Sequence, residues 1–175
     1  NEAITNVDRS IETIFNELNN KDLLQNTVVV VTSNHGWEFI ETKSNSWGAG
    51  NNYSKYQVQV PMVIHWPQMP AQTWQHTTSH FDLSVTLLQN LLGVTSNPND
   101  FSSGKNLFDS KPRQWILAGD DREFALISQN DTTVLDRYGN YKVFDLNYRR
   151  QREAKPKLSI IMQGLAETKR FYDQH

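Results

Sequence analysis

The fold class of this chain is decided by the stretch VVVVTSNHGWEF, residues 28–39. Val28 to Thr32 are all β-branched and show no polar–apolar alternation, which predicts a strand buried on both faces of a sheet. Two polar side chains, Asn34 and His35, follow within three residues of the strand, and Gly36 comes next. Open α/β sheets place their chemistry at such strand ends, so this turn is the leading candidate for a functional site.

The residues before this strand predict an amphipathic helix from about residue 3 to residue 19. Their apolar side chains recur at helical spacing: Ile4, Val7, Ile11, Ile14, Phe15 and Leu18. A helix followed by a buried strand is half of a βαβ unit, so we expect a parallel-type α/β sheet flanked by helices. Because the sequence opens within this helix, we expect the chain to be part of a longer protein.

Further along, residues 60–67 (VPMVIHWP) predict a second short strand, closed at each end by proline. The stretch SHFDLSVTLLQNLLG, residues 79–93, predicts a helix in which Ser79 and Asp82 have capping-box spacing and Gly93 ends the helix. Between the two strands lies a polar loop, residues 36–57. A loop of this length inside a compact domain is usually functional or mobile.

From about residue 113 the pattern changes to short strands separated by turn residues, which predicts an antiparallel meander. The last stretch predicts a closing helix with four apolar residues on one stripe: Leu158, Ile161, Leu165 and Tyr172. We therefore predict an α/β domain over residues 1–110 and a small antiparallel α+β subdomain over residues 111–175.

The composition excludes several classes of protein. The 175 residues carry a net charge of −2 with acids and bases intermixed, which gives no electrostatic basis for nucleic-acid binding. The absence of cysteine excludes disulfides and thiol chemistry. No apolar run approaches the roughly 20 residues that a membrane-spanning helix needs.

Asn34 and His35 are the candidate metal ligands. A neutral imidazole binds zinc or manganese well, and an amide oxygen is a weak neutral ligand. Both side chains reach one centre only if the turn bends, which Gly36 would allow. The alternative is a hydrogen-bonded turn that binds nothing.

Other polar residues near the two strand ends have two interpretations each. Glu38 is either a general acid or base or a solvated loop residue. His80, at the start of the predicted helix, is either a ligand or anion contact or a polar first-turn residue. The basic pair Arg149 and Arg150 either contacts anionic head groups or forms a solvated surface.

The long loop is unusually aromatic. Its large rings are Trp37, Trp47, Tyr53 and Tyr56. Such side chains either pack the loop against the protein or contact a lipid or glycan, and packing is the more general role.

The order and spacing of these motifs resemble the C-terminal half of the alkaline phosphatase and sulfatase superfamily. The motifs that carry the resemblance follow one another along nearly the whole chain: LLQNTVVVVTSNHG, VPMVIHWP, SHFDLSVTLLQNLLGV, GKNLF and YKVFDLN. The combination is specific, although each motif alone is not. The resemblance implies a partial alkaline-phosphatase-like (sulfatase) sheet flanked by helices, followed by an antiparallel meander and a helix.

One branch of the superfamily is most similar. The stretches NSWGAGNNYSKYQVQVPMVIHWPQMPAQ and KPKLSIIMQGLAETKRFY resemble the periplasmic domain of YejM/PbgA-type inner-membrane proteins. This resemblance implies a location on the periplasmic side of the inner membrane, anchored by a longer chain. It implies a role in lipopolysaccharide and outer-membrane lipid homeostasis, with envelope lipid or lipopolysaccharide and inner-membrane proteins as partners.

The resemblance also implies where catalysis would occur and where this sequence departs from it. Active members end the first strand in Asp-His or Asp-Asn and hold a divalent metal there (Mn, Mg, Ca or Zn), whereas this chain has Asn34. Synthase-type members often carry a histidine where this chain has Ala49, and His80 matches a frequent family residue. The family's nucleophile belongs to the N-terminal half, outside this chain. We therefore expect a degenerate hydrolase domain that binds lipid or protein partners, with Glu38, Ala49 and His80 as candidate site-lining residues. The alternative is an active metal-dependent sulfatase, phosphoesterase or phosphoglycerol-transferase-like hydrolase.

Overall fold

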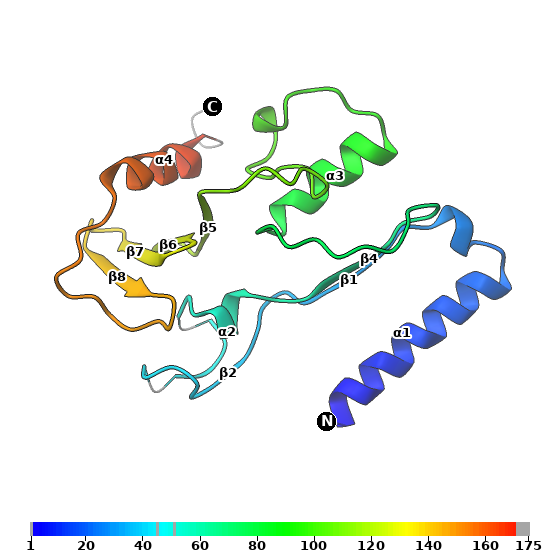
Figure 1. The fold of residues 1–175 in the computed structure, drawn as a ribbon, viewed down its shortest axis with the longest axis horizontal. Coiled ribbons are helices and arrows are strands. Elements are labelled where there is room, and N and C mark those ends of the chain that lie inside the picture. Colours follow the sequence, from blue (N-terminus) through cyan, green and yellow to red (C-terminus); the bar gives the residue numbers. More distant parts are fainter. Residues whose placement is uncertain (1, 45, 51, 171–175) are drawn as a thin grey trace. The chain divides into compact units, whose positions relative to one another are not determined.

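The computed structural model of the chain describes residues 2–44, 46–50 and 52–170 (Figure 1). These residues form two compact units. One unit draws on residues 1–34 and 60–73, and the other on residues 35–59 and 74–175. The division into domains at residue 110 stays a prediction.

The first unit opens with α1, Glu2–Asn20, which confirms the predicted amphipathic helix. None of its described side chains is buried, and Ile4, Val7 and Ile14 are more than half exposed. Phe15 meets the ring of His65 edge to face, with 5.8 Å between the ring centroids. His65 Nε2 is also hydrogen-bonded to the Leu24 carbonyl at 3.2 Å, so the side chain of this strand-end histidine has a hydrogen-bond partner within the unit.

The two strands of this unit run antiparallel. β1, Val29–Thr32, pairs with β4, Met62–His65, in the register Val29↔His65 to Thr32↔Met62 (Figure 1). The prediction of a parallel arrangement is therefore wrong for this pair. A parallel pair needs a long crossover connection, usually a helix. The connection here contains only two strands of two residues each and a one-turn helix. In a two-stranded sheet the three valines of β1 are half-buried rather than covered on both faces.

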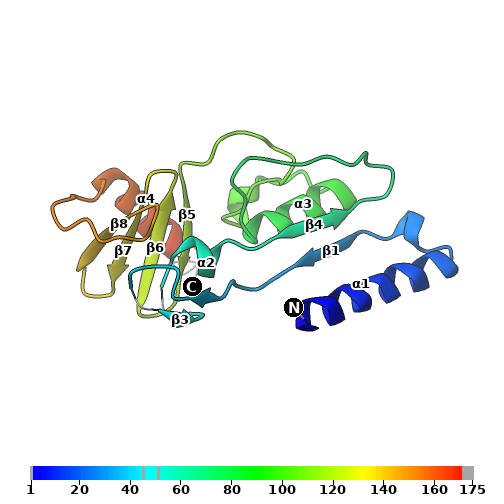
Figure 2. The same cartoon turned by 60° about the horizontal axis from the view of Figure 1, so that its bottom comes forward.

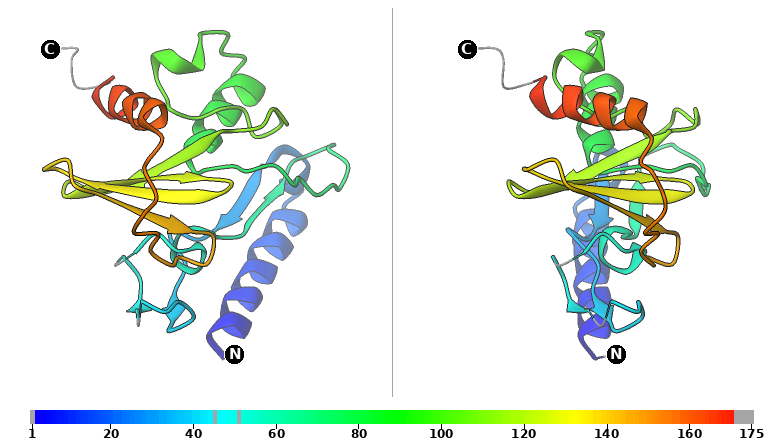
Figure 3. Two further views of the ribbon diagram at one scale, coloured as in Figure 1. Left: turned by 60° about the vertical axis from the view of Figure 1, so that its left-hand side comes forward. Right: turned by 90° about the vertical axis from the view of Figure 1, so that its left-hand side faces the viewer.

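The second unit contains the predicted meander. Its strands β5 (Trp115–Gly119), β6 (Glu123–Ser128), β7 (Asp131–Asp136) and β8 (Tyr141–Asp145) pair in sequence order, each antiparallel to the next. The last helix, α4, Leu158–Lys169, lies against one face of this sheet (Figures 2 and 3). The core between them consists of Leu126, Leu135 and Ile161, with half-buried Trp115, Leu117, Phe124, Ile160 and Leu165 around it.

The predicted closing helix is confirmed as α4, but only part of its apolar stripe is buried. Ile161 is buried and Leu165 packs on the core, whereas Leu158 is 69% exposed. The helix comes close to the sheet at Gly164, where an added Cβ would lie only 2.7 Å from Leu126 Cδ2. Leu158 begins the helix and lies beyond this contact. Tyr172 lies outside the described residues.

The helix α3, Phe81–Leu91, also belongs to the second unit. The Asp82 carboxylate accepts the Ser79 backbone N–H at 2.7 Å, which is the carboxylate half of the predicted capping box. Gly93 follows the helix with φ +65°, as predicted for a helix end. The short 3-10 helix η2, Pro98–Asp100, follows, and the chain then returns along α3.

The returning segment, residues 102–108, docks on α3 through its backbone. The Lys105 N–H donates to Asp82 Oδ1 at 2.8 Å and the Leu107 N–H to Thr86 Oγ1 at 2.7 Å. At Gly104 an added Cβ would lie 2.0 Å from the Phe81 carbonyl oxygen. The GKNLF motif therefore needs its glycine because two backbones touch there.

The predicted long loop is ordered by three short elements. β2, Glu38–Phe39, pairs antiparallel with β3, Trp47–Gly48, and the single turn α2, Lys55–Val58, closes the loop. We call β2, β3 and the turn between them the ribbon.

Candidate functional site

The turn after β1 begins with two exposed polar residues, Asn34 and His35. His35 Nδ1 lies 2.9 Å from the Gly36 carbonyl oxygen. Because a carbonyl oxygen only accepts hydrogen bonds, Nδ1 is the donor in this bond. Histidines that bind metals are commonly oriented in this way, through a bond from the other ring nitrogen.

Gly36 fixes the path of the chain beyond His35. Its N–H donates to the Gln57 carbonyl at 2.9 Å, and an added Cβ would lie 2.1 Å from the Tyr56 carbonyl oxygen. The glycine is therefore required by close backbone contact with α2. The sequence suggested a bend in which glycine supplies unusual dihedral angles, but Gly36 is not one of the positive-φ glycines.

The boundary between the two compact units lies between Asn34 and His35, so Asn34 belongs to the first unit and His35 to the second. Within the part of the chain that the structure describes, no three histidine or acidic side chains form a group that could hold a metal ion. One imidazole and one amide oxygen do not fit a complete divalent-metal site, which takes at least three protein ligands in zinc enzymes.

Glu38, the carboxylate nearest to His35 in sequence, is fully buried. Its Oε1 accepts the N–H and the hydroxyl of Thr42. Its Oε2 accepts from the side chains of Asn52 at 2.7 Å, Ser54 at 3.0 Å and Gln57 at 3.0 Å. A buried carboxylate with five donors organises the loop that surrounds it.

The electrostatics of Glu38 follow from these contacts. Burial alone would raise its pKa, but hydrogen bonds from Thr42, Asn52, Gln57 and Ser54 favour the ionised form and lower the pKa to about 2. Glu38 is therefore a permanently charged acceptor at neutral pH. This answers the alternative left open by the sequence: Glu38 is neither a solvated loop residue nor a group tuned for proton transfer near neutral pH.

The other two candidate site-lining residues lie in separate parts of the second unit. Ala49 is half-buried and directly follows β3. His80 is exposed and precedes α3, and its side chain does not cap that helix. Their assignment to a site stays a prediction.

The sequence did not identify the ion pair that anchors α3. Arg113 Nη2 lies 2.5 Å from Asp82 Oδ1, and the two side chains are 11% and 2% exposed. Arg113 Nη1 also donates to Ser79 Oγ at 3.2 Å. The capping-box spacing was the signal available for Asp82, but nothing in the sequence linked it to an arginine 31 residues away.

A second unexpected contact joins the long loop to the meander. The Tyr53 N–H donates to the Tyr148 hydroxyl at 3.1 Å, and the Tyr53 hydroxyl donates to the Glu123 carbonyl at 3.3 Å. Burial, aided by the charge of Glu123, raises the pKa of Tyr53, so its hydroxyl stays a donor. Tyr148 in turn stacks on Phe144 with 4.2 Å between ring centroids.

Comparisons with known proteins agree with the motif order. The sequence profile of the sulfatase family matches residues 1–94. The inner membrane protein YejM of Salmonella typhimurium (strain LT2) is 35% identical over 171 residues, which is 97% of this chain and 28% of that protein. YejM of Salmonella typhi gives the same values. An uncharacterised protein of Haemophilus influenzae is 33% identical over 152 residues, or 86% of this chain and 26% of that protein.

This chain therefore spans little more than a quarter of the length of the curated relatives, and it corresponds to a C-terminal part of YejM. Among its described helices, none is long and apolar enough to cross a membrane.

Proposed function

This chain belongs to the sulfatase family, and from that premise we propose that it is part of a sulfatase-like domain that has lost catalysis and binds envelope lipid. In this proposal the domain lies on the periplasmic side of the inner membrane and takes part in lipopolysaccharide and outer-membrane lipid homeostasis. Inner-membrane proteins are its further partners, reached through the longer polypeptide. The curated relatives named inner membrane proteins support this location.

The observation that carries the proposal is the residue at position 34. The family resemblance calls for an aspartate at this strand end, and the chain has the neutral Asn34. A divalent ion there would lose the attraction of one formal negative charge at ligand distance, where charge–charge energies are largest. A metal-bound nucleophile would also lose part of its activation.

Two further residues support a loss of catalysis. The carboxylate of Glu38 could have replaced the missing charge, but its oxygens are occupied by five donors within the loop. Ala49 carries a methyl group where the resemblance calls for a histidine in synthase-type members, and a methyl group neither binds a metal nor transfers a proton.

One observation favours the second candidate function, an active metal-dependent sulfatase, phosphoesterase or phosphoglycerol-transferase-like hydrolase. His35 Nδ1 donates to the Gly36 carbonyl, an arrangement that is common in histidines that coordinate metals through the other ring nitrogen. In such an enzyme His35 would bind Mn, Mg, Ca or Zn, and other ligands and the nucleophile would come from the N-terminal half of the family domain.

The two candidates are separated by assaying the complete periplasmic domain that contains this chain. We expect no turnover of a chromogenic phosphate or sulfate ester with Mn²⁺, Mg²⁺, Ca²⁺ or Zn²⁺, and we expect binding of lipopolysaccharide or phospholipid with or without EDTA. Metal-dependent turnover that is abolished by His35→Ala would overturn the proposal. The control is Tyr138→Ala, at the exposed turn between β7 and β8, which is expected to change neither measurement.

A further inference from the structure

The ribbon has its polar side inside and its apolar side outside. Residues alternate between the two faces of a β ribbon, so Glu38 and its partner Gly48 share one face and Phe39 and its partner Trp47 share the other. The face with Glu38 is buried, whereas Phe39 is 56% and Trp47 is 61% exposed. A folded protein rarely leaves its large aromatic side chains on the solvent side of an ordered ribbon without a use for them.

The exposed side chains touch one another. The rings of Phe39 and Trp47 are perpendicular, with 5.2 Å between centroids, and Trp37 lies 6.4 Å from Phe39. Trp37 also covers Gly48, since its Cζ2 lies 3.7 Å from the position of an added Cβ there. Trp37 is 52% exposed. We call Trp37, Phe39 and Trp47 the aromatic face.

Two backbone N–H groups beneath the aromatic face donate to groups of the ribbon itself. The Phe39 N–H donates to the Glu41 carboxylate, and the Ile40 N–H donates to the Ser46 carbonyl at 3.0 Å. An N–H group without a hydrogen-bond partner makes it unfavourable for a loop to enter an apolar phase. The buried Glu38 holds the ribbon in shape from the other side, so the aromatic face is presented on a preformed support.

Three arginines follow closely in sequence after a tyrosine that is hydrogen-bonded to this loop. The hydrogen bond from Tyr53 to Tyr148 joins the loop to the segment that continues with Arg149, Arg150 and Arg152, all exposed. Within residues 2–44, 46–50 and 52–170, none of these three guanidinium groups is in an ion pair. Lys43, in the turn of the ribbon itself, is also exposed.

We propose that the aromatic face enters the interfacial layer of an anionic phospholipid bilayer while Arg149, Arg150 and Lys43 contact its head groups. Tryptophan and phenylalanine suit this layer because their rings are apolar and the indole N–H stays near water. Stable attachment of a peripheral surface takes two signals, an apolar one and a basic one, and this unit supplies both. The inference deepens the proposed function by naming the surface and the class of lipid, and it rests on that function.

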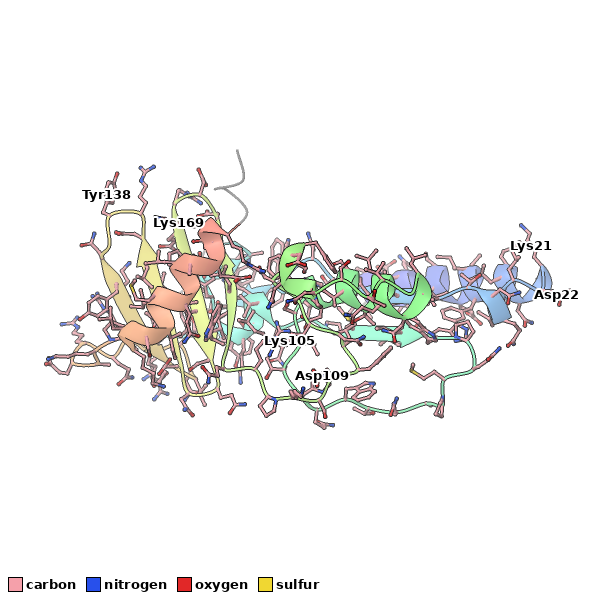
Figure 4. All side chains as sticks on the ribbon, turned by 90° about the horizontal axis from the view of Figure 1, so that it is seen from above. Lys21, Asp22, Lys105, Asp109, Tyr138 and Lys169 are labelled. Atoms are coloured by element: carbon pink, nitrogen blue, oxygen red, sulfur yellow. The ribbon has the colours of Figure 1, made fainter. Side chains whose placement is uncertain are left out.

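The test uses the complete periplasmic domain that contains this chain, with any cysteine outside these 175 residues replaced by serine. A single cysteine at Phe39→Cys is labelled with an environment-sensitive dye and titrated with vesicles of equal parts phosphatidylcholine and phosphatidylglycerol. We expect the emission to shift to the blue, and to shift much less with phosphatidylcholine alone. The control label is Tyr138→Cys, at the exposed β7–β8 turn (Figure 4), which is expected not to respond.

A second pair of variants separates the aromatic face from another exposed apolar surface, that of α1. The triple variant Trp37→Ser/Phe39→Ser/Trp47→Ser is expected to lose at least about tenfold in vesicle affinity. The matched triple Ile4→Ser/Val7→Ser/Ile14→Ser is expected to bind like the parent. Circular dichroism checks that both variants keep the parent fold.

Two results would overturn the inference. If the aromatic triple binds vesicles like the parent, the aromatic face is not the lipid contact, although lipid binding by the domain would stand. If the label at position 39 responds to a free oligosaccharide and not to vesicles, the face binds sugar rings instead. Both results are read from binding to vesicles or sugar, whereas turnover decides whether the domain has lost catalysis.

Discussion

Arg113 Nη2 lies 2.5 Å from Asp82 Oδ1, and this ion pair joins the segment just before β5 to the first turn of α3. Asp82 also accepts two backbone N–H groups, from Ser79 and Lys105. One carboxylate therefore joins three segments of the second unit. Several of the predictions below depend on such buried polar groups.

Removing the Arg113 side chain should destabilise the folded protein. Arg113→Ala leaves the buried Asp82 without its counter-charge, and we expect a loss of about 3 kcal/mol in the free energy of unfolding, measured by urea denaturation. The matched control is Arg122→Ala, which breaks the solvent-exposed pair with Asp120 and should leave the unfolding midpoint unchanged. Equal effects of the two substitutions would show that the Asp82 pair is not a buried anchor.

Glu38 should make stability depend on pH at the acid end. Its folded-state pKa of about 2 is below the ordinary value of 4.5, so the fold favours the ionised form. The resulting stabilisation is complete above about pH 4.5 and is lost as the pH falls toward about 2. Unfolding measured across this range should show a steeper decline for the parent than for Glu38→Gln.

At neutral pH Glu38→Gln should also destabilise the protein by about 1–3 kcal/mol. The NH2 group of the new glutamine would face hydrogen-bond donors, and these donors would then lack an acceptor. Glu41→Gln is the control on the same ribbon, since Glu41 is exposed. A parallel pH dependence in parent and Glu38→Gln would contradict the role of the buried carboxylate.

Gly164 and Leu126 should be coupled. A Cβ at position 164 would lie 2.7 Å from Leu126 Cδ2, so Gly164→Ala overpacks the interface of α4 with the sheet and should cost about 1–3 kcal/mol. Leu126→Ala opens a cavity and should cost about 3 kcal/mol. The double variant should lose less than the sum, because the new methyl group occupies part of the cavity. Strict additivity in thermal or urea unfolding would mean that the two residues do not touch.

Ile40 has a φ of +70°, which a β-branched residue rarely adopts. Ile40→Gly should relieve this strain and raise the free energy of unfolding by about 1 kcal/mol. Ile40→Ala is the matched control, because it shortens the side chain but keeps the Cβ that causes the strain, so it should stabilise less. A protein destabilised by Ile40→Gly would show that this backbone conformation is not strained.

Restoring the missing charge should restore metal affinity. Asn34→Asp supplies the carboxylate that the family resemblance calls for beside His35, and we expect at least about tenfold tighter Mn²⁺ or Zn²⁺ binding by calorimetry. The double variant Asn34→Asp/His35→Ala should lose this gain. If Asn34→Asp binds metal no better than the parent, position 34 does not face a metal site.

Residues close together in the sequence were sufficient to predict many of the helices and strands of this protein. The 3.6-residue spacing of apolar side chains determined α1 and α3, and turn residues at short intervals determined the four-stranded meander. The order of the motifs determined the family. These features depend on residues close in sequence, so they can be predicted without knowing what packs against them.

Only the tertiary structure decided how those elements meet. It turned β4 antiparallel to β1, buried Glu38 among five donors, and paired Asp82 with an arginine 31 residues away. It also showed that Gly36 and Gly164 serve close contacts rather than unusual dihedral angles. Burial and ion pairing are set by segments distant in sequence, because they depend on which groups lose contact with water when the chain folds. The turn after β1 was found from its residues alone, whereas the role of the carboxylate beside it required the fold.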